Sequence, residues 1–323
     1  MRHSQLVQIH GTGVNVSRLS LGTAPLGGLF KKVSESESDS VIGEALDAGI
    51  AYIDTAPLYG YGVGEVRVGR GIKGHHRQPV ISTKVGRLLR PGKNLEYDKF
   101  PDSDPNLEIY FDHTASGIRK SLEESLKRLD RDSVEIAYIH DADSWVREAI
   151  EVVYPELHKM RDEGLIKAIG IGMNWCPTSI AIMTETELNI ALIAGRFTLL
   201  DQSAQEELYP LALKKKVSII AAGVFNSGVL ANPVQGAYYD YEPAPKEIID
   251  KARSIGKFLE KFDISLPAAA LQFPSRHPAV ASVLTGAGSV IELRENIANF
   301  NVQIPDEIWS QMESDGLISP IIL

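Results

Sequence analysis

The segment VEIAYIHDADSWVREAIEVVYPELHKMRDEGLIKAIGIGMN, residues 134–174, contains the pattern that decides the fold. It begins with one apolar run, Val134–His140, and ends with another, Ala168–Met173. Neither run alternates between polar and apolar residues, which is typical of a strand buried on both faces. The stretch between them, Val146–Arg161, has the length and pattern of a helix. The segment therefore predicts a strand–helix–strand unit with parallel strands.

The same unit recurs along the chain. Further apolar runs of this kind are Leu19–Gly22, Tyr52–Asp54, Val80–Lys84, Ile190–Ala194, Val217–Ala221 and Ala281–Thr285. Further helical patterns are Ser38–Ala48, Thr114–Leu129, Pro177–Glu187, Ala204–Lys215, Pro245–Phe262 and Ser289–Phe300. Eight strands, mostly separated by helices, predict an α/β protein with a closed (β/α)8 TIM barrel, formed by one domain over residues 1–323. The alternative, an open doubly wound sheet, requires a G-x-G-x-x-G turn after the first strand, and Gly22–Gly28 lacks that spacing.

Some segments fall outside the repeat. Leu6–Ile9 and Asn15–Leu19 are expected to form an N-terminal β-hairpin, and Ile304–Asp315 an extra C-terminal helix. Gly86–Asn106 and Gly223–Pro245 are long proline-containing loops. Loops of this length in a compact domain are usually functional or disordered.

Composition excludes several classes of partner. The chain has 323 residues, 44% of them hydrophobic, and a formal net charge of −9. That charge argues against binding to the phosphate backbone of a nucleic acid. No apolar run approaches the length of a membrane span. Cys176 is the single cysteine, so neither an internal disulfide nor a zinc site is expected, and a reducing, cytoplasmic setting is the simplest interpretation. A monomer and a small homo-oligomer are both compatible with the sequence.

Polar residues end several of the predicted strands. Asp54, Lys84 and His140 close three runs, Asn174 directly follows a fourth, and Tyr59 lies five residues after Asp54. Each has an ordinary explanation when taken alone, such as a helix cap or a solvated rim charge. In a barrel, however, the C-terminal ends of the strands meet at one mouth, where active sites form. The coincidence favours an active site.

The residue types suit proton transfer to or from a carbonyl or alcohol oxygen. A tyrosine titrates near pH 10, and a neighbouring ammonium such as Lys84 is expected to lower the pKa of Tyr59. Asp54 would hold the lysine, and His140 would orient the substrate oxygen. The set contains neither metal ligands nor a nucleophile–base pair, so a hydride has to come from a nicotinamide. We expect these four residues to be catalytic and no metal to take part.

These residues, in this order, resemble those of the aldo-keto reductase superfamily. The most specific blocks are AYIDTAPLYGYGVGEVRVGRGI, residues 51–72, and LTGAGSVIELRENI, residues 284–297. The resemblance implies a barrel plugged by the N-terminal hairpin and a nicotinamide cofactor. It also implies that Tyr59 is the proton donor and that Asp54, Lys84 and His140 complete the site.

The resemblance also implies a set of cofactor contacts. Asn174 matches an asparagine that bonds the carboxamide, and Ala222–Leu230 matches a loop around the nicotinamide and pyrophosphate. Glycines before a helix near residue 289 present free N–H groups to phosphate. For Phe225 a core or lid role is an equal alternative. The implied cofactor residues are Gly22, Thr23, Asp54, Asn174, Phe225, Asn226, Ser227, Gly228, Leu230, Gly286, Gly288, Glu292, Glu295 and Asn296.

Two departures from the family pattern bear on the cofactor. Gly286 stands where NADP-preferring members often have a lysine, and Glu292 stands where they often have an arginine. A carboxylate there repels a 2′-phosphate, although the nearby Arg294 would partly compensate. NAD is therefore expected, with NADP as the alternative.

Within the superfamily the chain is most similar to the aldose 1-dehydrogenase branch, which includes L-fucose, D-threo-aldose and L-galactose dehydrogenases and a pyridoxal 4-dehydrogenase. The blocks that carry this likeness are APLYGYGVGE, IHDAD, RFTLLDQS and AAGVFNSGVLA. The implied reaction oxidises a cyclic hemiacetal of a small molecule to its lactone. Alternatives are pyridoxal oxidation, NADPH-dependent reduction of aldehydes or ketones, and a non-catalytic regulatory role.

Substrate contacts are expected from four residues, and two acids are further candidates. Asp141 and Asp143 are placed to bond sugar hydroxyls, although a helix cap is an equal alternative for Asp143. The expected substrate residues are Leu58, Tyr59, His140 and Trp175.

Overall fold

The structure, a computed structural model, describes residues 2–322. The eight predicted strands form a closed barrel in the order β10–β11–β14–β3–β4–β5–β8–β9, with every neighbouring pair parallel. The strands are β3 (Leu19–Gly22), β4 (Tyr52–Asp54), β5 (Val80–Val85), β8 (Ile136–His140), β9 (Ala168–Met173), β10 (Ile190–Ala194), β11 (Ser218–Ala222) and β14 (Val280–Gly286). The expected TIM barrel is confirmed, and strand bounds shift by two residues at most.

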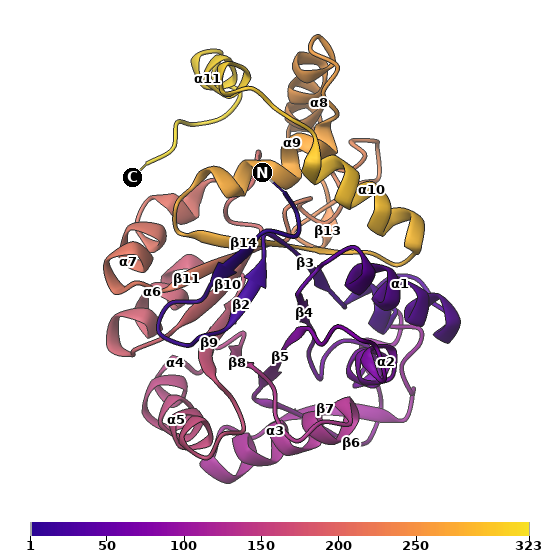
Figure 1. Cartoon of the computed structure of the whole chain (residues 1–323), viewed down its shortest axis with the longest axis vertical. Coiled ribbons are helices and arrows are strands. Elements are labelled where there is room, and N and C mark those ends of the chain that lie inside the picture. Colours follow the sequence, from indigo (N-terminus) through magenta and orange to yellow (C-terminus); the bar gives the residue numbers. More distant parts are fainter. Residues whose placement is uncertain (1, 323) are drawn as a thin grey trace.

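Helices surround this barrel (Figure 1). They are α1 (Glu35–Asp47), α2 (Val63–Ile72), α3 (Ala115–Leu129), α4 (Val146–Glu148), α5 (Tyr154–Asp162), α6 (Cys176–Glu185), α7 (Leu208–Lys215), α8 (Lys246–Glu260), α9 (Leu266–Gln272), α10 (Val290–Asn301) and α11 (Asp306–Ser314). A π-helical turn, Ala149–Val153, joins α4 to α5, so the expected helix Val146–Arg161 is nearly continuous. The expected extra C-terminal helix corresponds to α11. Within residues 2–322 no helix combines the length and the apolar character that a membrane crossing requires.

The barrel interior has its own core, which the N-terminal hairpin closes. Strands β1 (Leu6–Gln8) and β2 (Asn15–Ser17) pair antiparallel, as predicted. The hairpin side chains Ile9, Val14 and Val16 are buried with Tyr52 and Tyr138 from inside the barrel. In Figure 1 this hairpin crosses one end of the barrel. The opposite end, where the strands finish, stays open for a site.

Helix α2 is an element that the sequence pattern did not indicate. Its glycines disfavour a helix in isolation, but they allow neighbouring helices to come very close. A Cβ added at Gly69 would lie 2.4 Å from the carbonyl oxygen of Leu129 in α3, and one at Gly71 would lie 2.7 Å from Ile42 in α1. Tertiary packing therefore stabilises α2, although the local helix propensity of its glycines is low.

Both long loops form small hairpins, and the first hairpin extends beyond the predicted end of its loop at Asn106. In the first, β6 (Arg87–Pro91) pairs antiparallel with β7 (Leu107–Phe111). In the second, β12 (Tyr238–Tyr239) pairs with β13 (Glu242–Pro243). They follow β5 and β11 respectively, so both leave the barrel at its C-terminal mouth.

Candidate active site

A buried lysine ties the centre of the mouth together. Lys84 Nζ donates to Asp54 Oδ2 at 2.6 Å, to the Thr55 carbonyl oxygen at 2.9 Å and to Tyr59 Oη at 3.1 Å. The side chains of Lys84 and Asp54 are each 1% exposed. Because Tyr59 Oη accepts from the lysine, its own hydrogen is free to be donated elsewhere. The structure thus brings together three of the four residues expected to be catalytic.

A chain of hydroxyl groups supports the carboxylate from inside the barrel. Ser82 Oγ donates to Asp54 Oδ1 at 2.6 Å, Ser82 Oγ lies 2.9 Å from Tyr52 Oη, and Tyr52 Oη lies 2.9 Å from Tyr138 Oη. An ionised carboxylate only accepts hydrogen bonds. Ser82 therefore points its hydrogen at Asp54, which leaves it to accept from Tyr52, and Tyr52 in turn to accept from Tyr138. Sequence patterns gave no sign of this chain, since its members look like ordinary barrel residues.

Burial controls the protonation of Tyr59 and Lys84. Burial raises the pKa of Tyr59 well above its ordinary value, and the Asp54 carboxylate acts in the same direction. Burial also lowers the pKa of Lys84, while Asp54 opposes that change. The net direction for Tyr59 is opposite to the one expected from the neighbouring ammonium, because a low-dielectric site disfavours the charged phenolate. At neutral pH the residue is a phenol, ready to act as an acid.

His140 completes the group as a neutral imidazole. Burial lowers its pKa well below the ordinary value, and the positive charges of Arg87 and Lys84 add to this effect. Its ring meets that of Tyr59 edge-on, with centroids 6.5 Å apart. Within residues 2–322, the buried Nδ1 atom has no hydrogen-bond partner. A neutral ring of this kind has one N–H to donate to a substrate oxygen.

Two adjoining cavities occupy the mouth. One, of about 300 Å³, is lined by Asp54, Leu58, Tyr59, Lys84 and His140, among others. The second, of about 400 Å³, extends over the ends of β9, β10 and β11. Residues lining both include Asn174, Gly223, Tyr241 and Gly286. The shared walls make one long cleft that runs away from the catalytic group.

The cleft has features that suit the nicotinamide end of a dinucleotide. Asn226 Oδ1 is buried and lacks a hydrogen-bond partner within residues 2–322, and its residue lines the 400 Å³ cavity. Asn226, Ser227 and Gly228 have positive φ angles of 45°, 60° and 110°, conformations that concentrate at binding sites. The expected cofactor residues that line the cleft are Gly22, Asp54, Asn174, Phe225, Asn226, Ser227, Gly228 and Gly286. This part of the mouth therefore fits the group.

Other expected cofactor residues lie elsewhere. Thr23 is fully buried and its hydroxyl donates to the Asp54 carbonyl oxygen at 2.9 Å. Leu230 is also fully buried, and its N–H donates to the Phe225 carbonyl oxygen. Asn296 donates its amide to the Gly286 carbonyl oxygen at 3.2 Å, and Glu295 is exposed on α10. Neither cavity reaches these four residues.

The N-terminus of α10 differs from the expectation of free N–H groups. The N–H of Gly288 donates to Glu292 Oε2 at 2.7 Å, that of Val290 to Glu37 Oε1 at 3.0 Å, and that of Glu292 to Ser289 Oγ at 3.2 Å. Two of these three acceptors are carboxylates, so the helix end already holds negative charge. The local pattern Ser-x-x-Glu indicates a capping box, although Glu292 bonds the N–H of Gly288 and not that of the N-cap Ser289. The contribution of Glu37 depends on the fold.

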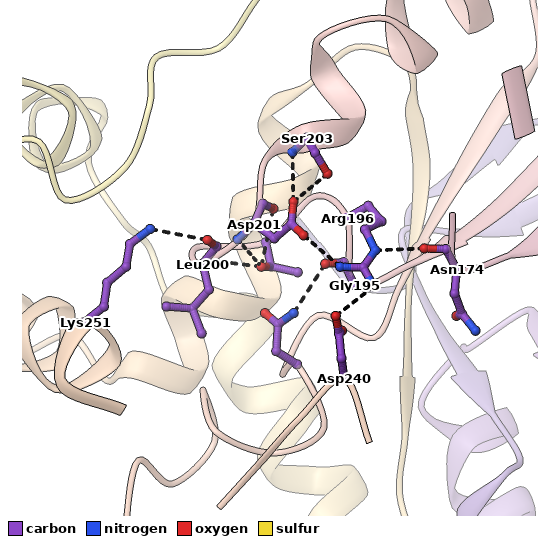
Figure 2. Close-up of polar contacts among 10 residues, drawn as sticks. Asn174, Gly195, Arg196, Leu200, Asp201, Ser203, Asp240 and Lys251 are labelled. Carbon is purple, nitrogen blue, oxygen red and sulfur yellow. Dashed lines mark hydrogen bonds and ion pairs between the residues drawn. The ribbon is translucent and has the colours of Figure 1, made fainter. Parts of the chain in front are cut away.

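Arg196 organises the far side of the cleft, a role that sequence reasoning missed. Figure 2 shows its guanidinium among Asp201, Asp240 and the Asn174 carbonyl oxygen, with distances of 2.9, 2.8 and 2.8 Å respectively. The same group lies 4.8 Å from the ring centre of Trp175. The fixed backbone leaves the Asn174 amide available to the cleft. The only sequence signal was the block RFTLLDQS, which contains Arg196.

Trp175 lies beside the cofactor part of the cleft, not beside the catalytic group. It lines the 400 Å³ cavity and is 56% exposed, so core packing does not describe it, and its contact with a substrate stays a prediction. Glu96 and Phe100 of the first long loop and Tyr241 of the second line the cavity around Tyr59. Both long loops were expected to be functional, which agrees with their place beside Tyr59, but the sequence did not single out these three residues.

One group of possible metal ligands lies outside the mouth. Asp47, His75 and His76 offer ligand atoms within 4.8 Å of one another, and His75 Nε2 lies 3.3 Å from Asp47 Oδ1. Asp47 ends α1, which leads into the start of β4, so the group lies at the opposite end of the barrel. It has no part in the catalytic geometry.

A parallel barrel with a buried Tyr–Lys–Asp group, a neutral histidine and an adjoining cleft beside Asn174 and Asn226 is typical of nicotinamide-dependent oxidoreductases. The family model described as "Aldo/keto reductase family" matches residues 18–315. The chain belongs to the aldo/keto reductase family, and it is an NAD(P)-dependent oxidoreductase.

The curated relatives are similar over nearly their whole length. Pyridoxal 4-dehydrogenase of Microbacterium luteolum is 38% identical, with 95% of this chain and 96% of that protein covered. D-threo-aldose 1-dehydrogenase of a Pseudomonas species is 37% identical, again covering 95% and 96%. Among solved structures, the holo form of aldo-keto reductase AKR11C1 from Bacillus halodurans is similar with a TM-score of 0.80, at 24% identity and with 99% and 98% covered. That structural likeness shows the fold.

Proposed function

We propose that this enzyme oxidises the cyclic hemiacetal of an aldose to its lactone, with NAD as the acceptor. The observation that carries the proposal is the contact of Tyr59 Oη with Lys84 Nζ at 3.1 Å, in a cavity that His140 and Asp141 make polar. The cavity has apolar walls such as Leu58 and Phe100, but its polar groups offer hydrogen-bond partners to a polyhydroxylated molecule, which a simple aldehyde would leave unused. The 37% identity with D-threo-aldose 1-dehydrogenase supports the same substrate class.

In the proposed mechanism the anomeric hydroxyl of the sugar binds between Tyr59 Oη and the N–H of His140. Tyr59, in its phenolate form, takes the hydroxyl proton, and the carbon–oxygen double bond of the lactone forms as the hydride leaves. The ammonium of Lys84 stabilises the phenolate, and Asp54 keeps the ammonium in place. The bound nicotinamide supplies the acceptor for the hydride. In the reverse direction the phenol donates its proton to a carbonyl oxygen.

The α10 N-terminus favours NAD over NADP. A 2′-phosphate near Gly288 would meet the carboxylates of Glu292 and Glu37, which already occupy the helix end. Arg294, which was expected to compensate, is bound bidentately to Glu44 at 2.8 and 2.9 Å. We expect Glu292→Lys to lower the KM for NADP+ at least tenfold while the KM for NAD+ rises. An unchanged ratio of the two would contradict this assignment.

The decisive experiment measures reduction of NAD+ and NADP+ against a panel of aldoses and pyridoxal, with wild type and Tyr59→Phe. Aldose turnover that falls by about 10²–10⁴ in the variant supports the proposal. NADPH-driven reduction of simple aldehydes, without turnover of any aldose or of pyridoxal, would overturn it. Near-normal turnover in Tyr59→Phe would remove the tyrosine from its role.

Pyridoxal is the second candidate substrate. The 38% identity with pyridoxal 4-dehydrogenase favours it specifically, and it also offers a hemiacetal and a neighbouring hydroxyl. A higher kcat/KM for pyridoxal than for every aldose on the panel would replace the first candidate. We place the reaction in the cytoplasm, since the chain has a single cysteine.

A further inference from the structure

Asp141 lines the cavity around Tyr59, and it forms an ion pair with Arg87 that the proposed mechanism does not use. Arg87 Nη2 donates to Asp141 Oδ2 at 2.9 Å, and Arg87 Nη1 lies 3.5 Å from the His140 carbonyl oxygen. Both side chains are mostly buried, with exposed fractions of 12% for Arg87 and 26% for Asp141. Charged groups are rarely placed in such surroundings unless they are paired.

The backbone places Asp141 toward the reacting groups. Asp141 directly follows β8, has a φ of 45°, and donates its N–H to the Gly172 carbonyl oxygen at 3.0 Å. Its Oδ2 lies 3.5 Å from Nε2 of His140, and the residue lines the same cavity as Tyr59 and Lys84. A group bonded by Asp141 would therefore lie beside the oxygen that Tyr59 and His140 are proposed to hold.

One oxygen of this carboxylate is available. Oδ2 is taken by Arg87, and within residues 2–322 no protein group bonds to Oδ1. An ionised carboxylate only accepts hydrogen bonds, so its natural partner is an O–H or N–H donor. A neutral sugar or hydroxyaldehyde offers hydroxyl groups.

We propose that the Arg87–Asp141 pair is a hydroxyl-binding subsite, which selects substrates with a hydroxyl group next to the reacting carbon. Burial raises the pKa of Asp141, whereas the charge and the hydrogen bond of Arg87 lower it, so Arg87 both holds the carboxylate in place and favours its ionised form. In this form Asp141 Oδ1 accepts the substrate hydroxyl. The substrate class is thus an α-hydroxy aldehyde or its hemiacetal, and simple aldehydes lack the group that the subsite binds. This inference rests on the proposed function, since it concerns the substrate of that same reaction.

The neighbouring Asp143 provides a matched control. It lies two residues further along the same loop, but its Oδ1 accepts from Thr178 Oγ1 of α6 at 2.7 Å. It does not line the cavity around Tyr59. Removing its charge tests the effect of a lost carboxylate in this loop. Because the charge of Asp143 raises the pKa of Asp141, its removal favours the ionised form of Asp141 and leaves the proposed subsite able to accept a hydroxyl.

The experiment compares kcat/KM for an aldose and for its 2-deoxy analogue, with saturating NAD+, in wild type, Asp141→Asn and Asp143→Asn. We expect wild type to prefer the aldose by about 10- to 150-fold, the effect of one hydrogen bond to a charged group. Asp141→Asn should lose most of that preference because kcat/KM falls for the aldose and stays unchanged for the 2-deoxy analogue. Asp143→Asn should keep the preference. The Kd for NAD+, measured by fluorescence titration, should stay unchanged in both variants.

The outcomes separate the subsite from the proposed function. Turnover of the aldose without preference over the 2-deoxy sugar, or an equal loss of both substrates in Asp141→Asn, would overturn the subsite and leave the function standing. No turnover of either sugar by wild type would overturn both. Should Asp141→Asn fail to fold, Arg87→Lys, which retains the charge but not the fork geometry, is expected to give an intermediate preference. An unaltered preference in that variant would count against the pair.

Discussion

The buried pair Lys84–Asp54 leads to a quantitative prediction for Asp54→Asn. The two side chains are 1% exposed and 2.6 Å apart, so the substitution leaves an ammonium in the core without its counter-charge. Breaking a buried pair in this way costs about 3–5 kcal/mol. Lys84 keeps the Thr55 carbonyl oxygen and Tyr59 Oη as acceptors, so we expect the lower end, about 3 kcal/mol. That is a large part of the usual 5–15 kcal/mol of a folded domain.

The assay is urea unfolding at several pH values, with the free energy of unfolding compared between wild type and variant. The cost is present while Lys84 carries its charge. Because burial lowers the pKa of Lys84, and the loss of Asp54 lowers it further, the cost shrinks as the pH rises through that pKa. The surface pair Lys73–Asp130 is the control. The two groups are 2.7 Å apart but mostly exposed, so Asp130→Asn should change the free energy of unfolding little.

A double-mutant cycle decides whether the lost charge pairing is the cause. Lys84→Met removes the ammonium, so Asp54→Asn should cost much less in the Lys84→Met background than in wild type. A cost below 1 kcal/mol in wild type, or additive costs in the cycle, would refute the reasoning.

Three further predictions follow from the structure. Because burial raises the pKa of Tyr59 well above its ordinary value and oxidation requires the phenolate, log kcat/KM for oxidation should rise by about one unit per pH unit at neutral pH. An acidic optimum for oxidation would contradict this. Tyr52→Phe should cost about 1–3 kcal/mol in urea unfolding, because the buried hydroxyl of Tyr138 loses its acceptor. The double variant with Tyr138→Phe should cost less than the sum of the two single changes, and strict additivity would speak against the chain. Gly69→Ala should lower the thermal midpoint, because its Cβ would lie 2.4 Å from a carbonyl oxygen. Gly43→Ala, which meets open space in α1, should instead add about 0.5–1 kcal/mol of stability through helix propensity and so raise the midpoint. Equal shifts in the two glycine variants would argue against close helix packing.

The strands and the strand-end residues could be predicted because their signals are local. A run such as Ala168–Met173 is uniformly apolar, and the barrel then brings Asp54, Lys84 and His140 to one mouth. Helix α2 could not be predicted, because its glycines are explained only by contacts with Leu129 and other residues distant in sequence. Contacts between residues far apart in the chain leave no periodic pattern in the sequence.

The expectation of free N–H groups at the cofactor end of the site was wrong for a related reason. Free N–H groups were expected before α10, but Glu37, more than 250 residues away in the sequence, bonds one of them. Likewise, the pKa of Tyr59 depends on its burial, which residue types alone do not reveal. The sequence was enough to identify the chemical groups, whereas their electrostatic environment could be described only from the fold.

The hydroxyl chain behind Asp54 changes how charge is shared among Asp54, Lys84 and Tyr59. Three aligned O–H dipoles, ending at Ser82 Oγ, direct their positive ends at one oxygen of the carboxylate. The negative charge is thus solvated partly from inside the barrel, as a few fixed water molecules would do. Lys84 therefore donates only some of its hydrogen bonds to Asp54, and one is donated to Tyr59 Oη. The buried hydroxyl groups of Ser82, Tyr52 and Tyr138 thus solvate the carboxylate with fixed orientation. Lys84 can then strengthen its hydrogen bond to Tyr59 Oη when the tyrosine ionises.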